Sequence, residues 1–332
     1  MFRRSPLAVT VLTLVLFGVG FYAALEFRGK NDETVTRTQI ALGTLIEIKV
    51  RGMQTADADA AMTAALYELR RVDTLFSTYL PESPVWRLNH TEATVVRVPP
   101  EIHDLMLRCD TLWERSNGAF DIAIEEVLRA WKFDSGNPAI PTDHVLTEAL
   151  GRSGWRQITL EQGNYVRRST GATLNFGSVA KGYAVDRAVA ILRQYGVTEA
   201  LINAGGDIRA IGGEWQVGIQ HPRSPSELLT VVRLDGRAIA TSGDYEQYFE
   251  EGGVRYHHIF DPATGFPARG LRSVSVIADD VATADAVSTA AFVLGTGKGL
   301  EFLRDYPDIE GLIVDEHGVE HSTPGFERYR KR

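Results

Sequence analysis

The chain is poor in cysteine, since Cys109 is the only one among its 332 residues. One cysteine can form neither an internal disulfide nor a cysteine-cluster metal site, so both of those classes are excluded. Basic charge is also in deficit, with 35 Lys and Arg against 43 Asp and Glu and a net charge of -8. Nucleic-acid binders gather basic residues against the phosphate backbone. We therefore expect no nucleic-acid partner.

The chain also lacks familiar nucleotide-binding and linker patterns. It contains no G-x-x-x-x-G-K-[ST] sequence, which excludes the P-loop NTPases. The glycines of residues 295–299 lack the G-x-G-x-x-G spacing, and we predict a helix boundary there. We find no repeat, low-complexity tract or proline-rich linker, and 44% hydrophobic content is enough for one large core. Separate domains in the body are therefore not indicated.

One long uncharged apolar run is present at residues 7–25, directly after Arg3 and Arg4. As a helix it would span about 28 Å, enough to cross a bilayer. Ala23 and Ala24 offer only a weak cleavage site, so an uncleaved signal anchor is the preferred interpretation. We predict a signal anchor and the start of a polar tether at residues 1–30, and a globular body at residues 31–332.

The body contains both hydrophobic periodicities: the alternation typical of strands and the spacing of three to four residues typical of helices. Apolar residues alternate at 46–50, which predicts a strand, and recur every three or four residues at 62–76 and 102–113, which predicts amphipathic helices. A helix capped by Thr142 is expected to run through Leu150. The second half alternates strands and helices, so the prediction is one α+β body. Expected strands there are 172–176, 200–203, 215–219, 230–234, 255–260 and 273–278, and expected helices are 181–195 and 284–294.

The densest cluster of functional residue types is NFGSVAKG at residues 175–182. A predicted strand ends at Gly177, and a helix begins with Lys181 in its first turn. Free amides and the positive dipole at such a helix start suit an anion, and the lysine adds a charge. An ordinary strand-to-helix turn fits the same pattern. Likewise, NAGGD at residues 203–207 is either a turn capped by Asp207 or a backbone contact to a ligand.

Asp285 and Thr289 stand four residues apart on a predicted helix, so their side chains share one face. Together they can offer hard oxygen ligands to one magnesium ion. The neighbouring residues are apolar and would bury Asp285, so a partner for its charge is expected. A salt bridge or a helix cap would satisfy the carboxylate equally well.

Two adjacent histidines lie in another predicted strand, at 255–260. His257 and His258 must face opposite sides of it, so only one of them can face a given site. Histidine titrates near neutrality and can accept a proton from a hydroxyl, although a strand histidine is often simply hydrogen-bonded.

Taken together and in order, these motifs resemble the ApbE family of FAD:protein FMN transferases. The resemblance covers nearly the whole body, and it is specific because many short motifs agree at once. The matching segments are LGT at 42–44, FSTY at 76–79, GAFD at 118–121, NFGSVAKG at 175–182, NAGGD at 203–207, ATSGD at 240–244, HHIFDPATG at 257–265 and ADAVST at 284–289.

The resemblance implies an ApbE-like α+β fold with mixed sheets flanked by helices, which binds FAD as substrate with magnesium at the pyrophosphate. It implies that Asp285 and Thr289 bind the metal through side chains and Ser178 through the main chain, and that His258 is the catalytic base. It also implies a set of residues lining the flavin nucleotide. These are Leu42, Tyr79, Ala119, Phe120, Asp121, Asn175, Lys181 and Ile259. The family often has methionine in place of Leu42 and aspartate in place of Asn175.

The implied reaction is magnesium-dependent transfer of FMN from FAD to a threonine or serine hydroxyl of another protein, with release of AMP. The acceptor is expected to be a membrane-associated redox subunit. The layout of the N-terminus and the resemblance together predict a single-pass inner-membrane protein with its body in the periplasm. Two alternatives stay open from the residues: a magnesium-dependent FAD pyrophosphatase and a non-catalytic flavin-binding protein. Self-modification at Thr173, within the sequence STGAT, is a further hypothesis.

Overall fold

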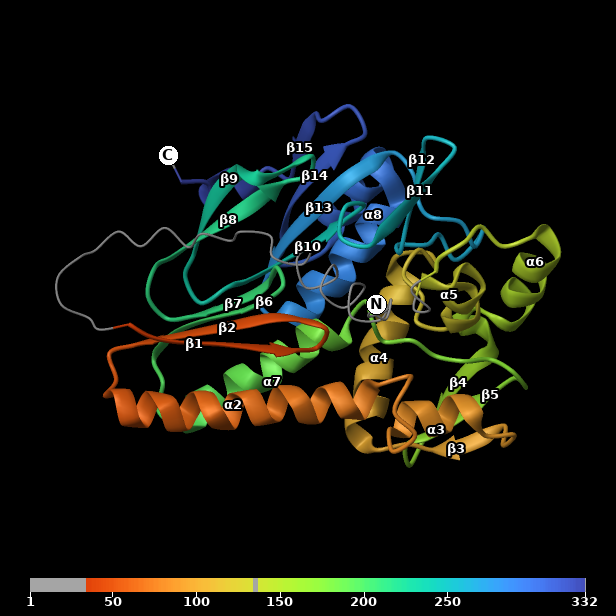
Figure 1. Ribbon diagram of the computed structural model, residues 1–332, viewed down its shortest axis with the longest axis horizontal. Coiled ribbons are helices and arrows are strands. Elements are labelled where there is room, and N and C mark those ends of the chain that lie inside the picture. Colours follow the sequence, from red (N-terminus) through yellow and green to blue (C-terminus); the bar gives the residue numbers. More distant parts are fainter. Residues whose placement is uncertain (1–33, 134–136, 332) are drawn as a thin grey trace, which may run out of the picture.

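An eight-stranded antiparallel sheet forms the centre of the protein (Figure 1). The computed structural model describes residues 34–133 and 137–331. Strands β1 and β15 are the two edges of this sheet. In spatial order the strands are β1 (Val35–Ala41), β2 (Thr44–Arg51), β6 (Glu199–Ala204), β7 (Asp207–Ile211), β10 (Ala238–Gly243), β13 (Leu271–Ala278), β14 (Glu310–Asp315) and β15 (Glu320–Ser322).

Three long helices cover one face of this sheet: α2 (Thr55–Phe76), α7 (Ala180–Gln194) and α8 (Val281–Asp305). Figure 1 shows α2 and α7 side by side. Alternate residues of the strands, such as Ile46 and Ile48, point toward the helices and are fully buried. The largest apolar core therefore lies between the sheet and the helices that carry the predicted site.

The opposite face is covered by a hairpin of β8 (Trp215–His221) and β9 (Ser224–Leu234). Its apolar residues, including Val217 and Val232, pack in a second core with Ile208 and Ile277 of the sheet. With helices on one face and a hairpin on the other, the molecule is of the α+β class, as predicted.

Shorter elements form the remainder of the body. A third apolar cluster centres on the fully buried Trp131, whose indole N–H donates to the Gly265 carbonyl at 2.8 Å. The elements are α3 (Pro84–His90), β3 (Val95–Arg97), α4 (Pro100–Arg115), α5 (Glu125–Trp131), α6 (Asp143–Arg152), η2 (Trp155–Gln157), β4 (Ile158–Glu161), β5 (Tyr165–Arg168), β11 (Tyr248–Glu251), β12 (Val254–His257) and η3 (Phe326–Arg328).

Most of the predicted helices are confirmed. Helices α2, α4, α7 and α8 occupy the expected regions, and the Thr142 hydroxyl accepts from the Val145 amide at the start of α6. Gly295 has non-helical backbone angles within α8, so the predicted helix boundary is a kink. The first described strand begins at Val35, which pairs with Val50 in the sheet.

One predicted strand is wrong. Residues 172–176 belong to no strand. The Asn89 side chain both donates to the Leu174 carbonyl and accepts from the Leu174 amide, each at 2.8 Å, and the Asn175 amide donates to the Ile122 carbonyl at 2.7 Å. Because these partners satisfy the backbone, this segment is stable without a neighbouring strand.

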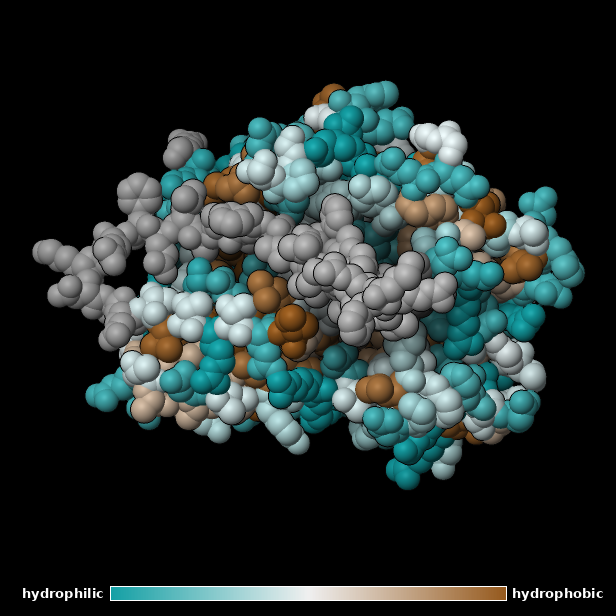
Figure 2. All heavy atoms as spheres, viewed as in Figure 1, coloured by the Kyte–Doolittle hydropathy of each residue, from teal (hydrophilic) through white to brown (hydrophobic). Residues whose placement is uncertain are grey.

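The predicted signal anchor at residues 7–25 lies outside the described residues. Among the helices within 34–133 and 137–331, none has the length and apolar character of a membrane span. Figure 2 shows a surface on which hydrophobic residues lie in small separate groups among hydrophilic ones. Such scattered apolar residues are ordinary for a protein surface.

Candidate active site

Lys181 lies in the first turn of α7, as predicted. Gly182 follows it, and a side chain at this position would come within 2.6 Å of the Val281 carbonyl oxygen. Glycine at 182 therefore lets α7 and α8 cross closely. The Gly182 amide donates to the Asp285 carboxylate at 3.3 Å, which ties the start of one helix to the side of the other.

Asp207 reaches the same place from the sheet. It follows the turn at Gly205 and Gly206, both of which have positive φ, and a side chain at 205 would overlap the Thr44 hydroxyl. Asp207 is almost fully buried, and its carboxylate lies 3.3 Å from the Lys181 ammonium. Its role is thus an ion pair across the site.

The charges of this cluster do not balance. Burial raises the pKa of Asp285 well above its ordinary value, and repulsion from Asp207 and Glu246 raises it further. Burial also raises the pKa of Asp207, although Lys181 acts against this. Burial lowers the pKa of Lys181, but the three carboxylates more than offset this and keep the ammonium protonated. The cluster is short of positive charge.

Thr289 lies one turn beyond Asp285 on α8 and is partly exposed. Its hydroxyl oxygen lies 3.1 Å from that of Ser242 on β10. Asp285 and Thr289 therefore share one helix face, as predicted, and the partner expected for Asp285 is present in the Gly182 amide and the neighbouring charges.

These residues fit a magnesium ion. Magnesium is typically held by one or two carboxylates together with substrate phosphates and water. Within the described part of the chain, no three His, Cys, Asp or Glu side chains converge as a metal cluster. Two buried carboxylates share one lysine here, so a hard cation bound together with a pyrophosphate would balance the remaining charge.

The two histidines differ sharply. His257 is buried, with Nε2 bonded to the Ala268 carbonyl at 2.8 Å and Nδ1 accepting from the Ile259 amide at 3.2 Å. His258 is partly exposed, and its Nδ1 lies 3.3 Å from the Gln247 carbonyl. Burial, aided by His257 and Lys181, lowers the pKa of His258 to about 4. His258 is therefore neutral at pH 7 and can accept a proton.

The predicted flavin-lining residues lie on several loops. Leu42 has φ of 52° in the turn between β1 and β2, and Tyr79 is exposed after α2. Phe120 is fully buried in the core, beside the nearly buried Ala119, and Ile259 is also buried. The side chain of Phe120 therefore belongs to the core.

The Asp121 carboxylate is occupied by backbone amides. It accepts from Ala123 at 2.7 Å and from Trp155 at 2.8 Å. Burial raises its pKa, although these bonds act against that. These contacts fix the loop after α4.

Asn175 makes two contacts that explain its departure from the aspartate common in the family. Its amide nitrogen donates to the buried Glu125 at 2.7 Å, and its oxygen accepts from the Gly177 amide at 2.7 Å. An aspartate here would face Glu125 with a second negative charge. Asn175 therefore holds the loop before Ser178 and bridges it to Glu125.

The sequence prediction did not identify Asp207, Ser242, Glu246 and Ser288 as site residues. In the sequence, Asp207 stands out only as part of a glycine turn. The two serines lie inside matched motifs, but their spacing does not mark them as site residues. The Thr173 hypothesis is opposed by the structure, because its side chain is buried and its hydroxyl donates to Glu126 at 3.0 Å.

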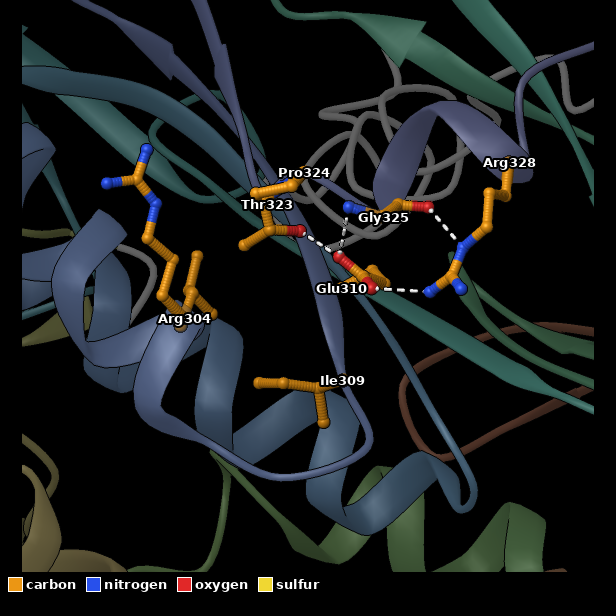
Figure 3. Close-up of a pocket in the computed structure, with 8 residues that line it drawn as sticks. Arg304, Ile309, Glu310, Thr323, Pro324, Gly325 and Arg328 are labelled. Atoms are coloured by element: carbon orange, nitrogen blue, oxygen red, sulfur yellow. Dashed lines mark hydrogen bonds and ion pairs between the residues drawn. The ribbon is translucent and has the colours of Figure 1, made fainter.

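A separate pocket of about 610 Å³ lies beside the C-terminal end of α8 (Figure 3). In it, Glu310 accepts from Thr323, from the Gly325 amide at 3.0 Å and from Arg328 at 2.9 Å. None of the predicted site residues lines this pocket. Its hydrogen bonds fasten the last residues of the chain to β14.

Comparison with known proteins identifies the family. The model of the ApbE family matches residues 42–313, a span that begins at Leu42 and includes Thr289. The chain belongs to the ApbE family. It is 32% identical to a FAD:protein FMN transferase of Treponema pallidum (strain Nichols), over 92% of this chain and 90% of that protein.

Solved ApbE structures share the fold. The ApbE protein of Thermotoga maritima superposes with a TM-score of 0.85 and 34% identity, covering 90% of this chain and 100% of that one. The flavinyl transferase ApbE of Pseudomonas stutzeri, in its apo form, has a TM-score of 0.80 and 29% identity, covering 91% and 98%. The predicted ApbE-like fold is thus confirmed for the body.

Proposed function

We propose that this protein transfers the FMN part of FAD to a threonine or serine hydroxyl of a target protein and releases AMP, in a magnesium-dependent reaction. The observation that carries the proposal is the cluster of Lys181, Asp207 and Asp285, where buried carboxylates outnumber cations next to a helix start. Membership of the ApbE family and the FMN transferases among its relatives support the same reaction.

Each of these residues has a separate role in the proposed reaction. Lys181, in the first turn of α7, binds and orients the pyrophosphate. Asp285 and Thr289, with the main chain of Ser178, would hold magnesium, which neutralises charge on the phosphates. The acceptor hydroxyl then forms a bond to the FMN phosphorus, and the bond from that phosphorus to the bridging oxygen breaks, so that AMP leaves.

His258 takes the proton of the attacking hydroxyl. Its neutral imidazole at pH 7 is the accepting form, and the negative charge of bound FAD favours the protonated form during transfer. Its partial exposure leaves the ring reachable by an acceptor side chain, unlike that of buried His257.

The test is mass spectrometry of a candidate acceptor protein after incubation with this protein, FAD and magnesium. We expect one threonine or serine to gain the mass of an FMN phosphoester, with stoichiometric AMP. Free FMN and AMP without any labelled acceptor, across a panel of membrane redox subunits, would instead indicate a pyrophosphatase. Bound FAD without turnover would indicate a flavin-binding protein.

We further propose that residues 7–25 anchor the protein in the inner membrane, with the body in the periplasm, where it modifies membrane-associated redox subunits. The support is the basic start and the long apolar run in the sequence. A reporter that is active only in the periplasm, fused after Arg332, should be active. Activity only from a cytoplasmic reporter at the same position would reverse the topology.

A further inference from the structure

Three hydroxyl groups form a continuous chain between the sheet and α8. Ser242 Oγ lies 2.8 Å from Ser288 Oγ and 3.1 Å from Thr289 Oγ1. Ser288 is fully buried and its hydroxyl donates to the Asp285 carbonyl at 2.9 Å. These hydrogen-bonded hydroxyl groups therefore connect the backbone of Asp285 to the side chain of Thr289.

The number of hydroxyl protons determines which group donates in each of these hydrogen bonds. Each hydroxyl carries one proton, and that of Ser288 is used on the Asp285 carbonyl. Ser288 can then only accept at its contact with Ser242, so Ser242 donates to it. The proton of Ser242 is thereby used, and its oxygen accepts from Thr289. As a result, the Thr289 proton points toward β10 and the oxygen lone pairs are left for another partner.

A helical threonine ordinarily donates to the carbonyl four residues before it, which for Thr289 is that of Asp285. Ser288 already donates to that carbonyl. The threonine is thus drawn to Ser242 instead, and its oxygen is turned into an acceptor, the form in which a hydroxyl binds a metal ion.

We propose that Ser242 and Ser288 are positioning residues that orient the Thr289 hydroxyl oxygen toward magnesium. This inference rests on the proposed function, because it assigns Thr289 as a metal ligand. The two serines do not touch the cation themselves. They act as outer partners of a ligand, and the loss of such partners typically weakens metal binding by about 10-fold or more.

A matched control lies next to Ser242 on the same strand. Thr241 points to the other face of β10, and its hydroxyl lies 2.8 Å from that of Ser275 on β13, its directly paired residue. Thr241→Ala removes a hydrogen-bonded hydroxyl from the same strand without touching α8. It therefore reports the cost of losing a strand hydroxyl in general.

The experiment measures the magnesium concentration that gives half-maximal FAD binding, followed by the quenching of flavin fluorescence. We expect Ser242→Ala to raise this concentration by about 10-fold. Ser288→Ala should raise it less, by about 3-fold, because Ser242 can still accept from Thr289. Thr241→Ala should change it by less than about 2-fold.

The decisive comparison repeats Ser242→Ala in a Thr289→Ala background. If Ser242 acts through Thr289, the second substitution has no further effect on the magnesium requirement. An equal rise in both backgrounds, or no rise in either, would overturn the proposal. Magnesium-independent FAD binding by the unmodified protein would instead contradict the metal site itself, and with it the proposed magnesium-dependent function.

Discussion

Two charged clusters in this protein are built from similar residues, yet one is complete and the other is not. In the first, Arg71 donates to both Glu68 and Glu101 at 2.7 to 2.9 Å. Arg187 adds a bond to Glu68 at 3.1 Å, and the Tyr183 hydroxyl donates to Glu101 at 2.9 Å. Two guanidinium groups thus face two carboxylates, and the charges balance.

In the second cluster, Lys181 alone faces the buried Asp207 and Asp285, with Glu246 nearby. The pKa shifts of the acids run in opposite directions. Arg71 lowers the pKa of Glu68. At Glu101, burial raises the pKa, but Arg71, Tyr183 and Arg187 together lower it by more, whereas the pKa values of Asp207 and Asp285 are raised. The balanced cluster holds helices together, while the unbalanced one is the place where we propose that magnesium binds.

The largest effect is expected at Asp285. Asp285→Asn keeps the size of the side chain but removes the charge that would hold magnesium, so FMN transfer should fall by roughly 1000-fold or more. The rate of acceptor labelling at saturating magnesium measures this. A folded Asp285→Asn protein with normal magnesium-dependent turnover would return Asp285 to a structural role and make the two clusters equivalent.

His258→Ala should reduce transfer by roughly 100-fold, the usual range for a lost general base, and should leave FAD binding intact. His257→Gln is the control, since His257 is bonded to Ala268 and Ile259 inside the fold. Its main effect should be on stability. Equal losses of turnover from the two substitutions, measured on folded protein, would contradict the assignment of His258 as the single general base.

The acid side of the pH profile should reflect the lowered pKa of His258. With a pKa of about 4, the imidazole stays neutral well below its ordinary value of 6.5. At saturating magnesium, kcat/KM for FAD, which reports the free protein, should therefore persist to about pH 5, whereas a base of ordinary pKa would already have lost most of it. A midpoint near 6.5 that disappears in His258→Ala would contradict this environment.

The balanced cluster should respond in stability alone. Glu68→Gln removes one carboxylate from Arg71 and Arg187, and we expect it to lower the free energy of unfolding by about 1–3 kcal/mol. Its magnesium requirement should match that of the unmodified protein. Denaturant unfolding measures the first quantity and FAD binding the second. A changed magnesium requirement would show that the two clusters are coupled.

The smallest expected effect is the pH dependence of that stability difference. The folded-state pKa of Glu68 lies below its ordinary value of 4.5. Its contribution is thus fully present above pH 4.5 and is lost as the pH falls through the lower folded-state value. The difference between the unmodified protein and Glu68→Gln should shrink between pH 6 and pH 3. A constant difference would mean that charge is not the source.

The sequence predicts the parts of the site that are local. Asp285 and Thr289 share a helix face because they are four residues apart, and Lys181 lies at a helix start because glycine ends the preceding segment. Those positions follow from helix geometry alone. Segment 172–176 was mispredicted as a strand because apolar composition does not show whether Asn89 or a second strand satisfies the backbone.

The parts that depend on tertiary contact could not be predicted. The pairing of Lys181 with Asp207 joins α7 to β7, and the bond between Ser242 and Thr289 spans 47 residues. Neither pair has a spacing that marks it. The difference between the two charged clusters is likewise invisible in the sequence, since it depends on how many cations the fold brings to each group of acids.

The most direct test of the central claim is the position of the cation. Manganese can stand in for magnesium, and its anomalous scattering would locate it in crystals grown with FAD. We expect one peak within about 2.0–2.5 Å of the Asp285 carboxylate and the Thr289 hydroxyl oxygen, beside the pyrophosphate. Bound FAD with no peak at these oxygens, or with the cation at another group of residues, would contradict the account.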